Sequence, residues 1–252
     1  KGLNYLILLS DKIDYFILYG NITNELEIIV YYIIVMYLFS ILYNNVKVYR
    51  CLLLLASIFV IFLNINVFSP EKAVYFLDVK GDSTFISDSF NRCNILIDTG
   101  ESDEYDSVIG FLLSKNVRKL DYLFISHFHS DHFGEYQDIM DDINVKTTIS
   151  PKNVENFYNR TITCGSISIY IYKLSNGDNN ENNNSIVMSV FIEERLYLFT
   201  GDAEIDRELE FLEQYHIDVD YLKVAHHGSN TSSGNVFIDQ IKPEEVFVMV
   251  YR

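Results

Sequence analysis

Hydrophobic residues are unevenly distributed along the chain, and its first part contains two long uncharged runs. No charged residue occurs between Ile28 and Asn45 or between Cys51 and Pro70, and both runs are almost wholly apolar. A helix needs about 20 such residues to cross a hydrocarbon core of about 30 Å. The runs therefore predict two transmembrane helices within residues 1–69. Two buried core helices are the alternative, whereas the lack of a small-residue cleavage site argues against a signal peptide.

The segments around these two runs indicate how the chain is oriented. Apolar residues recur at helical spacing in residues 3–20, which predicts an interfacial amphipathic helix or the tail of an earlier membrane segment. The loop between the runs carries Lys47 and Arg50, while the segment before the first run carries only acidic residues. By the positive-inside rule, the loop lies in the cytoplasm and residues 70–252 lie on the extracellular side. We therefore expect a multi-pass protein of the cell membrane.

Residues 70–252 show a different pattern, in which strand-like and helix-like segments alternate. Short apolar runs and alternating apolar residues predict strands, and apolar residues three or four positions apart predict helices. The predicted strands are 73–79, 84–87, 94–98, 122–126, 161–172, 185–192, 195–200, 219–224 and 246–251. The predicted helices are 104–115, 133–142 and 203–215. This part is expected to be a separate domain, with its boundary near Pro70.

Charge is divided along the chain in the same way. The formal net charge is -16, yet acidic and basic residues balance within residues 1–69, so the acidic excess lies in residues 70–252. That excess excludes a basic module that binds nucleic acid through phosphate contacts alone. The content of Val, Ile, Leu, Phe and Tyr argues against disorder. Cys51, Cys93 and Cys164 are too few and too scattered to predict a disulfide framework or a zinc ribbon.

Potential metal ligands cluster directly after the predicted strand 122–126. His127, His129, Asp131 and His132 lie within six residues of one another. Two histidines at i and i+2 on an extended stretch point to one side, so they can bind one metal, while Asp131 and His132 can face a second. Imidazole nitrogen and carboxylate oxygen bind both zinc and manganese. A histidine-rich polar turn is the alternative.

Two further strand ends carry candidate residues. Strand 195–200 is followed by Asp202, whose two carboxylate oxygens could bridge two metals, although Gly-Asp also occurs in ordinary turns. Strand 219–224 is followed by the doublet His226 and His227, and then by Gly and hydroxyl residues. Such a doublet suits one metal ligand and one group for substrate phosphate or proton transfer. A surface loop is the alternative here.

Taken together, these motifs resemble those of the metallo-β-lactamase superfamily. The order is His-x-His-x-Asp-His, then Thr-Gly-Asp about 70 residues later, then a histidine about 24 residues further on. Within that superfamily, LDVKGDSTFI followed by NILIDTG, together with HHGSNTSS, resembles the hydrolase domain of the ComEC family of competence DNA-uptake proteins. The resemblance covers residues 70–252 and implies an α+β fold, an αβ/βα sandwich preceded by transmembrane helices. That family's sequence usually continues past Arg252, so we expect this domain to be truncated.

The resemblance also implies how two divalent ions, Zn or Mn, would be bound. The implied ligands are His127 and His129 for one ion, Asp131, His132 and His226 for the other, and Asp202 as the bridge. Most superfamily members have one more histidine before the Thr-Gly-Asp, and here Asn184 occupies that place. An amide oxygen suits manganese better than zinc. The first ion is therefore expected to bind weakly or to be manganese.

The function implied is that of a membrane-anchored nuclease in a DNA-uptake channel. It would hydrolyse phosphodiesters of the strand that is not transported, with the rest of the channel as its partner. Asp131 would orient the attacking water, and His227 would donate a proton or bind a phosphate oxygen, although which histidine of the doublet is the ligand stays open. The hydroxyl groups that would bind the DNA backbone belong to Ser229, Ser232 and Ser233.

Two other functional classes remain open on the sequence. One is a metallohydrolase of small molecules such as lactones, thioesters or β-lactams, against which the HHGS motif and the membrane segments argue. The other is a catalytically weak or inactive domain with a transport or scaffold role. The missing histidine favours this second alternative, and the otherwise intact set of ligands argues against it.

Overall fold

In a computed structural model of the chain, the described residues are Tyr37, 72–175 and 180–250. The chain divides into two units, Lys1–Pro70 and Glu71–Arg252. The predicted amphipathic and transmembrane helices lie outside the described residues. Within the described ranges, no helix is long and apolar enough to cross a membrane.

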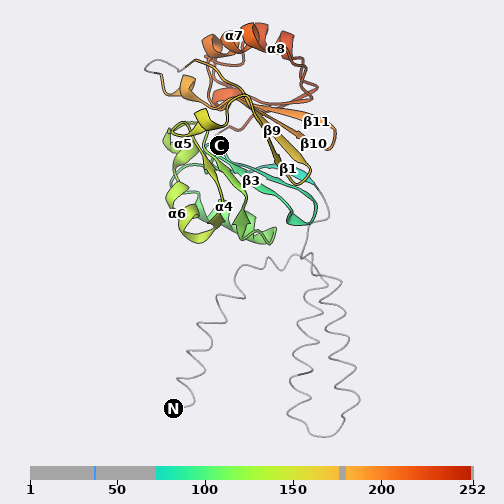
Figure 1. Cartoon of the computed structure of the whole chain (residues 1–252). Helices are drawn as coiled ribbons and strands as arrows, with labels where there is room; N and C mark the ends of the chain where they lie inside the picture. The colour runs from blue at the N-terminus through green and yellow to red at the C-terminus, as the bar shows by residue number, and fades with distance from the viewer. Residues whose placement is uncertain (1–36, 38–71, 176–179, 251–252) are drawn as a thin grey trace. The chain divides into compact units, whose positions relative to one another are not determined.

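Two β-sheets form the centre of the second unit (Figure 1). The strands of the first sheet, in spatial order, are β1 (Ala73–Phe76), β2 (Thr84–Ser87), β3 (Asn94–Ile97), β5 (Tyr122–Phe124) and β7 (Thr148–Ile149). Those of the second are β13 (Glu245–Phe247), β12 (Tyr221–Lys223), β11 (Arg195–Phe199), β10 (Met188–Ile192), β9 (Ile167–Ile171) and β8 (Thr161–Cys164). A small parallel pair consists of β4 (Lys119–Leu120) and β6 (Asn144–Val145).

Side-chain alternation along the strands assigns the two faces of the first sheet. Phe85 of β2 and Leu96 of β3 pack with the helices α4 (Tyr105–Ser114) and α6 (Tyr136–Asp142). Their neighbours Ile86 and Ile95 belong instead to the cluster shared with the second sheet. Successive residues of a strand point to opposite faces, so two adjacent apolar residues can serve two cores. This explains why each of these strands carries apolar residues at adjacent positions.

The outer face of the second sheet is covered in the same manner. Phe211 of α7 (Ile205–Gln214) and Phe237 of α8 (Asn235–Ile241) pack against Leu198 and Leu222 of the sheet. Figure 1 shows α4 and α6 on one side of the two sheets, and α7 and α8 on the other. The layers are thus helix, sheet, sheet and helix, and the predicted αβ/βα sandwich is confirmed.

Several local predictions differ from the structure. The single strand predicted over 161–172 is wrong, because the chain turns back at Gly165, with φ at +58°, and forms the antiparallel pair β8 and β9. The helix predicted over 133–142 is divided into α5 (Ser130–Phe133) and α6. Helix α8 was not predicted. The short 3-10 helices are η1 (Ser89–Asn91), η2 (Val154–Asn156), η3 (Asn182–Asn184) and η4 (Ala225–Gly228).

A disulfide joins the two sheets. Cys93, just before β3, is bonded to Cys164 at the end of β8, with 5.5 Å between the Cα atoms. Both cysteines are buried in the cluster between the sheets. The sequence analysis predicted no disulfide framework, and this single bond was missed because 71 residues separate its cysteines. Only the stacking of one sheet on the other brings them together.

Candidate metal centre

The three predicted groups of ligands meet at one edge of the sandwich. Strand β5 leads into the segment from His127 to His132, β11 leads into Asp202, and β12 leads into the doublet of histidines. Because β11 and β12 are parallel neighbours, their carboxyl ends lie side by side. The first sheet contributes its strand end from the opposite layer. The site is therefore made by both sheets.

The first group of possible ligands lies around His127. Its Nε2 is 3.1 Å from Nδ1 of His129 and 3.8 Å from Oδ2 of Asp202. The rings of the two histidines are edge-to-face, with their centres 4.8 Å apart. His127 is fully buried, while His129 is exposed. The i and i+2 histidines thus present one nitrogen each to a common point beside the Asp202 carboxylate.

The second group lies around His132 and uses the other oxygen of Asp202. His132 Nε2 is 3.2 Å from Oδ1 of Asp202 and 3.9 Å from Oδ2 of Asp131. The Nε2 of His227 is 3.1 Å from that same oxygen of Asp131. Asp202 therefore directs its two oxygens to two different sets of histidines. This is the arrangement that a carboxylate bridging two cations requires.

Asp98 holds the buried side of the site. It follows β3, and its Oδ2 accepts from Nδ1 of His132 at 2.9 Å and from the hydroxyl of Ser126 at 2.7 Å. Its Oδ1 accepts from the backbone N–H of Ser126 at 2.6 Å. The bond to Nδ1 directs Nε2 of His132 into the site, as a carboxylate behind a metal-binding histidine does. The sequence analysis did not identify Asp98, although its position at a strand end was a usable signal.

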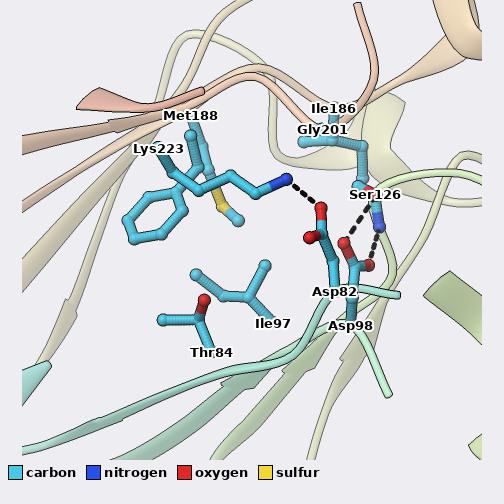
Figure 2. Close-up of a pocket in the computed structure, with 10 residues that line it drawn as sticks. Asp82, Thr84, Ile97, Asp98, Ser126, Ile186, Met188, Gly201 and Lys223 are labelled. Atoms are coloured by element: carbon cyan, nitrogen blue, oxygen red, sulfur yellow. Dashed lines mark hydrogen bonds and ion pairs between the residues drawn. The ribbon is translucent and has the colours of Figure 1, made fainter. Parts of the chain in front are cut away.

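Asp82 and Lys223 form a second buried feature behind the histidines. Figure 2 shows the Lys223 ammonium in contact with Asp82, and Ser126 bonded to Asp98 beside them. Asp82 Oδ1 is 3.6 Å from Nδ1 of His227. Burial lowers the pKa of Lys223 to about 7, and the Asp82 carboxylate favours the charged ammonium. Neither residue was predicted, because Asp82 lies in a turn far from the histidine motif in sequence.

Close backbone contact holds the turn of Asp82 against the histidine segment. The N–H of Asp82 donates to the carbonyl oxygen of Asp131 at 2.9 Å. Gly81, with φ at +80°, precedes it, and a Cβ at this position would overlap the same carbonyl. Any other residue at position 81 would overlap the Asp131 carbonyl and would also have to adopt a positive φ, which only glycine adopts without cost. The turn and the ligand segment therefore depend on glycine for their spacing.

The histidine doublet divides into two environments. Nδ1 of His227 bonds to the carbonyl oxygen of Met249 at 3.0 Å, which leaves Nε2 directed toward Asp131. The ring of His226 instead contacts the Thr231 hydroxyl at 3.2 Å. Both histidines have positive φ, 50° and 53°, a conformation that is costly for residues other than glycine. His227, and not His226, thus has its ring among the possible ligands.

The remaining predicted residues lie around the site in different ways. The side chain of Asn184 donates to Glu181 at 3.3 Å, and Glu181 also accepts from the backbone N–H of Phe128 at 3.1 Å. Ser232 is buried and donates to the Ala225 carbonyl at 2.9 Å. The hydroxyl of Ser229 contacts the hydroxyl of Thr231. The backbone N–H of Ser233 donates to the Glu208 carboxylate.

The charges of the site differ sharply among its members. Burial opposes protonation of His132, but the carboxylates of Asp98 and Asp202 outweigh it and raise the pKa of His132 to about 10. Burial and the charge on His132 lower the pKa of His127 to about 3. Burial raises the pKa of Asp202, but contact with His132 outweighs it and the net shift is downward. Without a metal, an ionised Asp202 thus lies beside a protonated His132.

The donor set fits a divalent cation. One ligand atom from each of Asp82, His132, Asp202 and His227 lies within 4.8 Å of the others. Asp82 Oδ1 is buried and has no hydrogen-bond partner among the described residues. Buried polar atoms are normally bonded, so an unbonded one facing a cluster of carboxylates and imidazoles suits a bound ion. These side chains therefore form a possible metal site.

Comparison with known proteins agrees with this geometry. Residues 78–168 match the family model described as "Metallo-beta-lactamase superfamily". The chain is 28% identical over 220 residues to "ComE operon protein 3" of Bacillus subtilis, which covers 71% of this chain and 28% of the relative. It is 29% identical over 185 residues to "Competence protein ComA" of Neisseria gonorrhoeae, covering 69% of this chain and 26% of the relative. The chain thus spans about a quarter of the length of these relatives.

A third relative and a solved structure extend the comparison. "Recombination protein 2" of Haemophilus influenzae is 28% identical over 222 residues, covering 81% of this chain and 28% of the relative. The metallo-β-lactamase fold protein YhfI from Bacillus subtilis superposes with a TM-score of 0.47 at 14% identity, covering 70% of this chain and 85% of the other. Part of the chain is thus similar to the metallo-β-lactamase superfamily, and a larger part is similar to competence proteins.

Proposed function

Starting from these similarities to the metallo-β-lactamase superfamily and to competence proteins, we propose that this chain is a metal-dependent phosphodiesterase that cleaves DNA. The observation that carries the proposal is the position of Asp202. Its Oδ2 faces His127 at 3.8 Å, and its Oδ1 faces His132 at 3.2 Å. A carboxylate shared in this way suits two adjacent cations, and two-metal sites are suited to in-line displacement at phosphorus.

The geometry favours one change in the ligand set implied by the resemblance. The proposed ligands are His127, His129 and Asp202 for one ion, and Asp82, Asp131, His132, Asp202 and His227 for the other. His227 takes the place of His226, because only its ring lies among the other ligands. Asn184 remains a candidate for the first ion, since it shares Glu181 with the backbone between His127 and His129.

The residues of the site would have separate roles in hydrolysis. The ions, when bound, would lower the pKa of the attacking water and stabilise the attacking and the leaving oxygens of the displacement at phosphorus. Asp131 lies at the open side of the second group, where it can orient that water. His226, whose ring contacts Thr231, is free of the ligand role and would bind a phosphate oxygen or donate a proton to the leaving oxygen. Asp98 would hold His132 in the required tautomer.

The proposed substrate is the DNA strand that is not transported by an uptake channel. The relatives named for competence support this, and the rest of that channel would be the partner. The acidic domain does not favour salt-driven binding to duplex DNA, but a channel would deliver the strand. The apolar runs in residues 1–69 support a location in the cell membrane. The Cys93–Cys164 disulfide supports an extracellular domain, since such bonds persist in oxidising compartments.

The test is cleavage by the metal-stripped chain after a single metal is restored. Labelled single- and double-stranded DNA would be incubated with Mn, Zn or Mg, beside Asp202→Asn and the matched control Asp239→Asn on the exposed face of α8. We expect metal-dependent cleavage that is lost in Asp202→Asn and kept in the control. Turnover of a chromogenic β-lactam without DNA cleavage would favour a small-molecule hydrolase. A folded, metal-loaded chain that cleaves neither would favour the scaffold role.

A further inference from the structure

A cavity of about 350 Å³ opens beside the first histidine group. Its lining includes the side chains of Phe128, Lys152, Tyr158, Asn184 and Arg207. We call this cavity, as defined by those five residues, the lateral pocket. None of the five is among the ligands proposed above except Asn184, the candidate for the first ion. The volume is sufficient for a ligand of the size of a nucleotide, and small-molecule sites usually exceed about 300 Å³.

The lateral pocket is tied directly to the metal centre. Phe128 lies between His127 and His129, so the same short segment supplies two possible ligands and one wall of the pocket. The backbone N–H of Phe128 donates to one oxygen of Glu181, and the side chain of Asn184 donates to the other. Both oxygens of Glu181 are therefore occupied, which holds the wall in place. A group bound in the pocket would lie next to the reacting centre.

Two cationic side chains line this pocket together with the carboxylates of Glu155 and Glu181. Lys152 is exposed, and its Nζ is 4.9 Å from the centre of the Phe128 ring. Arg207 is buried; its NH1 bonds to Ser175 and to Glu210, while its Nε is buried without a hydrogen-bond partner among the described residues. An unbonded buried donor is costly, and an acidic ligand oxygen is the group that would satisfy it.

A second cavity continues from the first along Tyr158. It has a volume of about 650 Å³, shares Glu155 and Tyr158 with the lateral pocket, and has Lys173 in its lining. The two cavities together offer a path that leads away from the metal centre, with an aromatic ring where they meet and a lysine beyond it. Aromatic rings and cations along a groove are the features that bind successive nucleotides of a single strand.

We propose that the lateral pocket receives one nucleotide of a single-stranded DNA, next to the phosphodiester that is cut. Lys152 and Arg207 would bind its phosphate, the Arg207 guanidinium turning toward the pocket, and Tyr158 would stack on its base. A base that is paired within a duplex cannot enter a cavity without leaving its stack, so the pocket selects single strands. The inference rests on the proposed function, whose substrate it narrows from DNA to single-stranded DNA.

The experiment measures binding without cleavage. The full chain, kept free of metal with a chelator, would be titrated with a fluorescent oligothymidine of about ten nucleotides, within the range bound by single-strand sites, and with a duplex of equal length. The variants are Lys152→Gln and Arg207→Gln, and the matched control is Lys146→Gln, an exposed lysine outside the pocket. Lys152→Gln changes an exposed side chain, so it keeps the test valid if Arg207→Gln fails to fold.

The expected result is a loss of affinity for single-stranded DNA alone. Each pocket variant should weaken oligothymidine binding about tenfold, as removal of a charged hydrogen bond does. It should also reduce the slope of log affinity against log salt by about 0.7. Duplex affinity and the control should be unchanged. If the pocket variants bind oligothymidine as tightly as the control does, the proposed role of the lateral pocket is wrong. It is also wrong if the variants lose equal affinity for the single strand and the duplex. Pocket-dependent binding by a metal-loaded chain that never cleaves would support the pocket while refuting the proposed function.

Discussion

Breaking the Cys93–Cys164 disulfide should reduce the free energy of unfolding of the domain by about 4 kcal/mol. The bond closes a loop of 71 residues between the two sheets. The chain-entropy relation for such a loop gives about 15 cal/mol/K, or about 4 kcal/mol at 25 °C. In a domain of this size, that change corresponds to a fall in Tm on the order of 10 °C. The effect is large because the closed loop is long.

The assay compares oxidised and reduced chains in a Cys51→Ala background, which leaves only the two cysteines of the disulfide. Urea unfolding, followed by far-UV circular dichroism, would give the free energy of each form, and a Cys93→Ala and Cys164→Ala double variant would be measured beside them. Free-thiol titration of the unfolded oxidised chain establishes whether the bond has formed. The double variant should resemble the reduced chain, apart from the small loss of packing at two buried sites.

Two results would refute this reasoning. If the oxidised chain releases two free thiols on unfolding, Cys93 and Cys164 are not paired in solution. If they are paired but reduction changes the unfolding free energy by less than about 1 kcal/mol, the loop-entropy argument does not apply to this domain. Formation of the bond in the cell would also bear on location, because disulfides are rare in cytosolic proteins.

Three further predictions concern the metal centre. Replacing Asp98 by Asn should weaken Mn binding 10- to 100-fold, roughly the usual cost of losing the carboxylate behind a metal-binding histidine. Competition with a chromogenic chelator would measure the affinity, and a change under twofold would contradict the role of Asp98 in holding His132. Because the pKa of His132 is raised to about 10, metal must displace its proton, so apparent Mn affinity should rise about tenfold per pH unit from pH 6 to 8; a flat profile would refute this. Gly81→Ala should lower both Tm and metal affinity by displacing the Asp131 carbonyl. The matched Gly110→Ala, in open space within α4, should stabilise the chain by about 0.5–1 kcal/mol; equal effects would contradict the steric argument.

Much of the candidate site could be predicted because its ligands are local in sequence. His127 and His129 follow directly on an apolar strand, and their i and i+2 spacing alone places them on one side. Asp202 likewise follows an apolar strand, three positions after its last residue. The end of a strand at a sheet edge is a local feature, so residues at such positions can be identified before the fold is known.

The partners behind these ligands could not be predicted in the same way. Asp82 reaches the site from the turn between β1 and β2, and Lys223 reaches Asp82 from the second sheet. The choice between His226 and His227 also depended on tertiary contacts, since the two residues are adjacent and chemically identical. Only the Met249 carbonyl and Asp131, on different sides of the His227 ring, distinguish them.

From the sequence by itself, the hydrophobic pattern indicated the strands and the strand ends that carry the candidate residues. The layers of the domain followed only from the resemblance of its motifs to those of a known family. The tertiary structure alone decided which groups from the two sheets face each other: Asp98 with His132, Asp82 with Lys223, and Cys93 with Cys164. The physical reason is that the stacking of two sheets is set by the fit of their whole inner faces, and no local pattern records that fit.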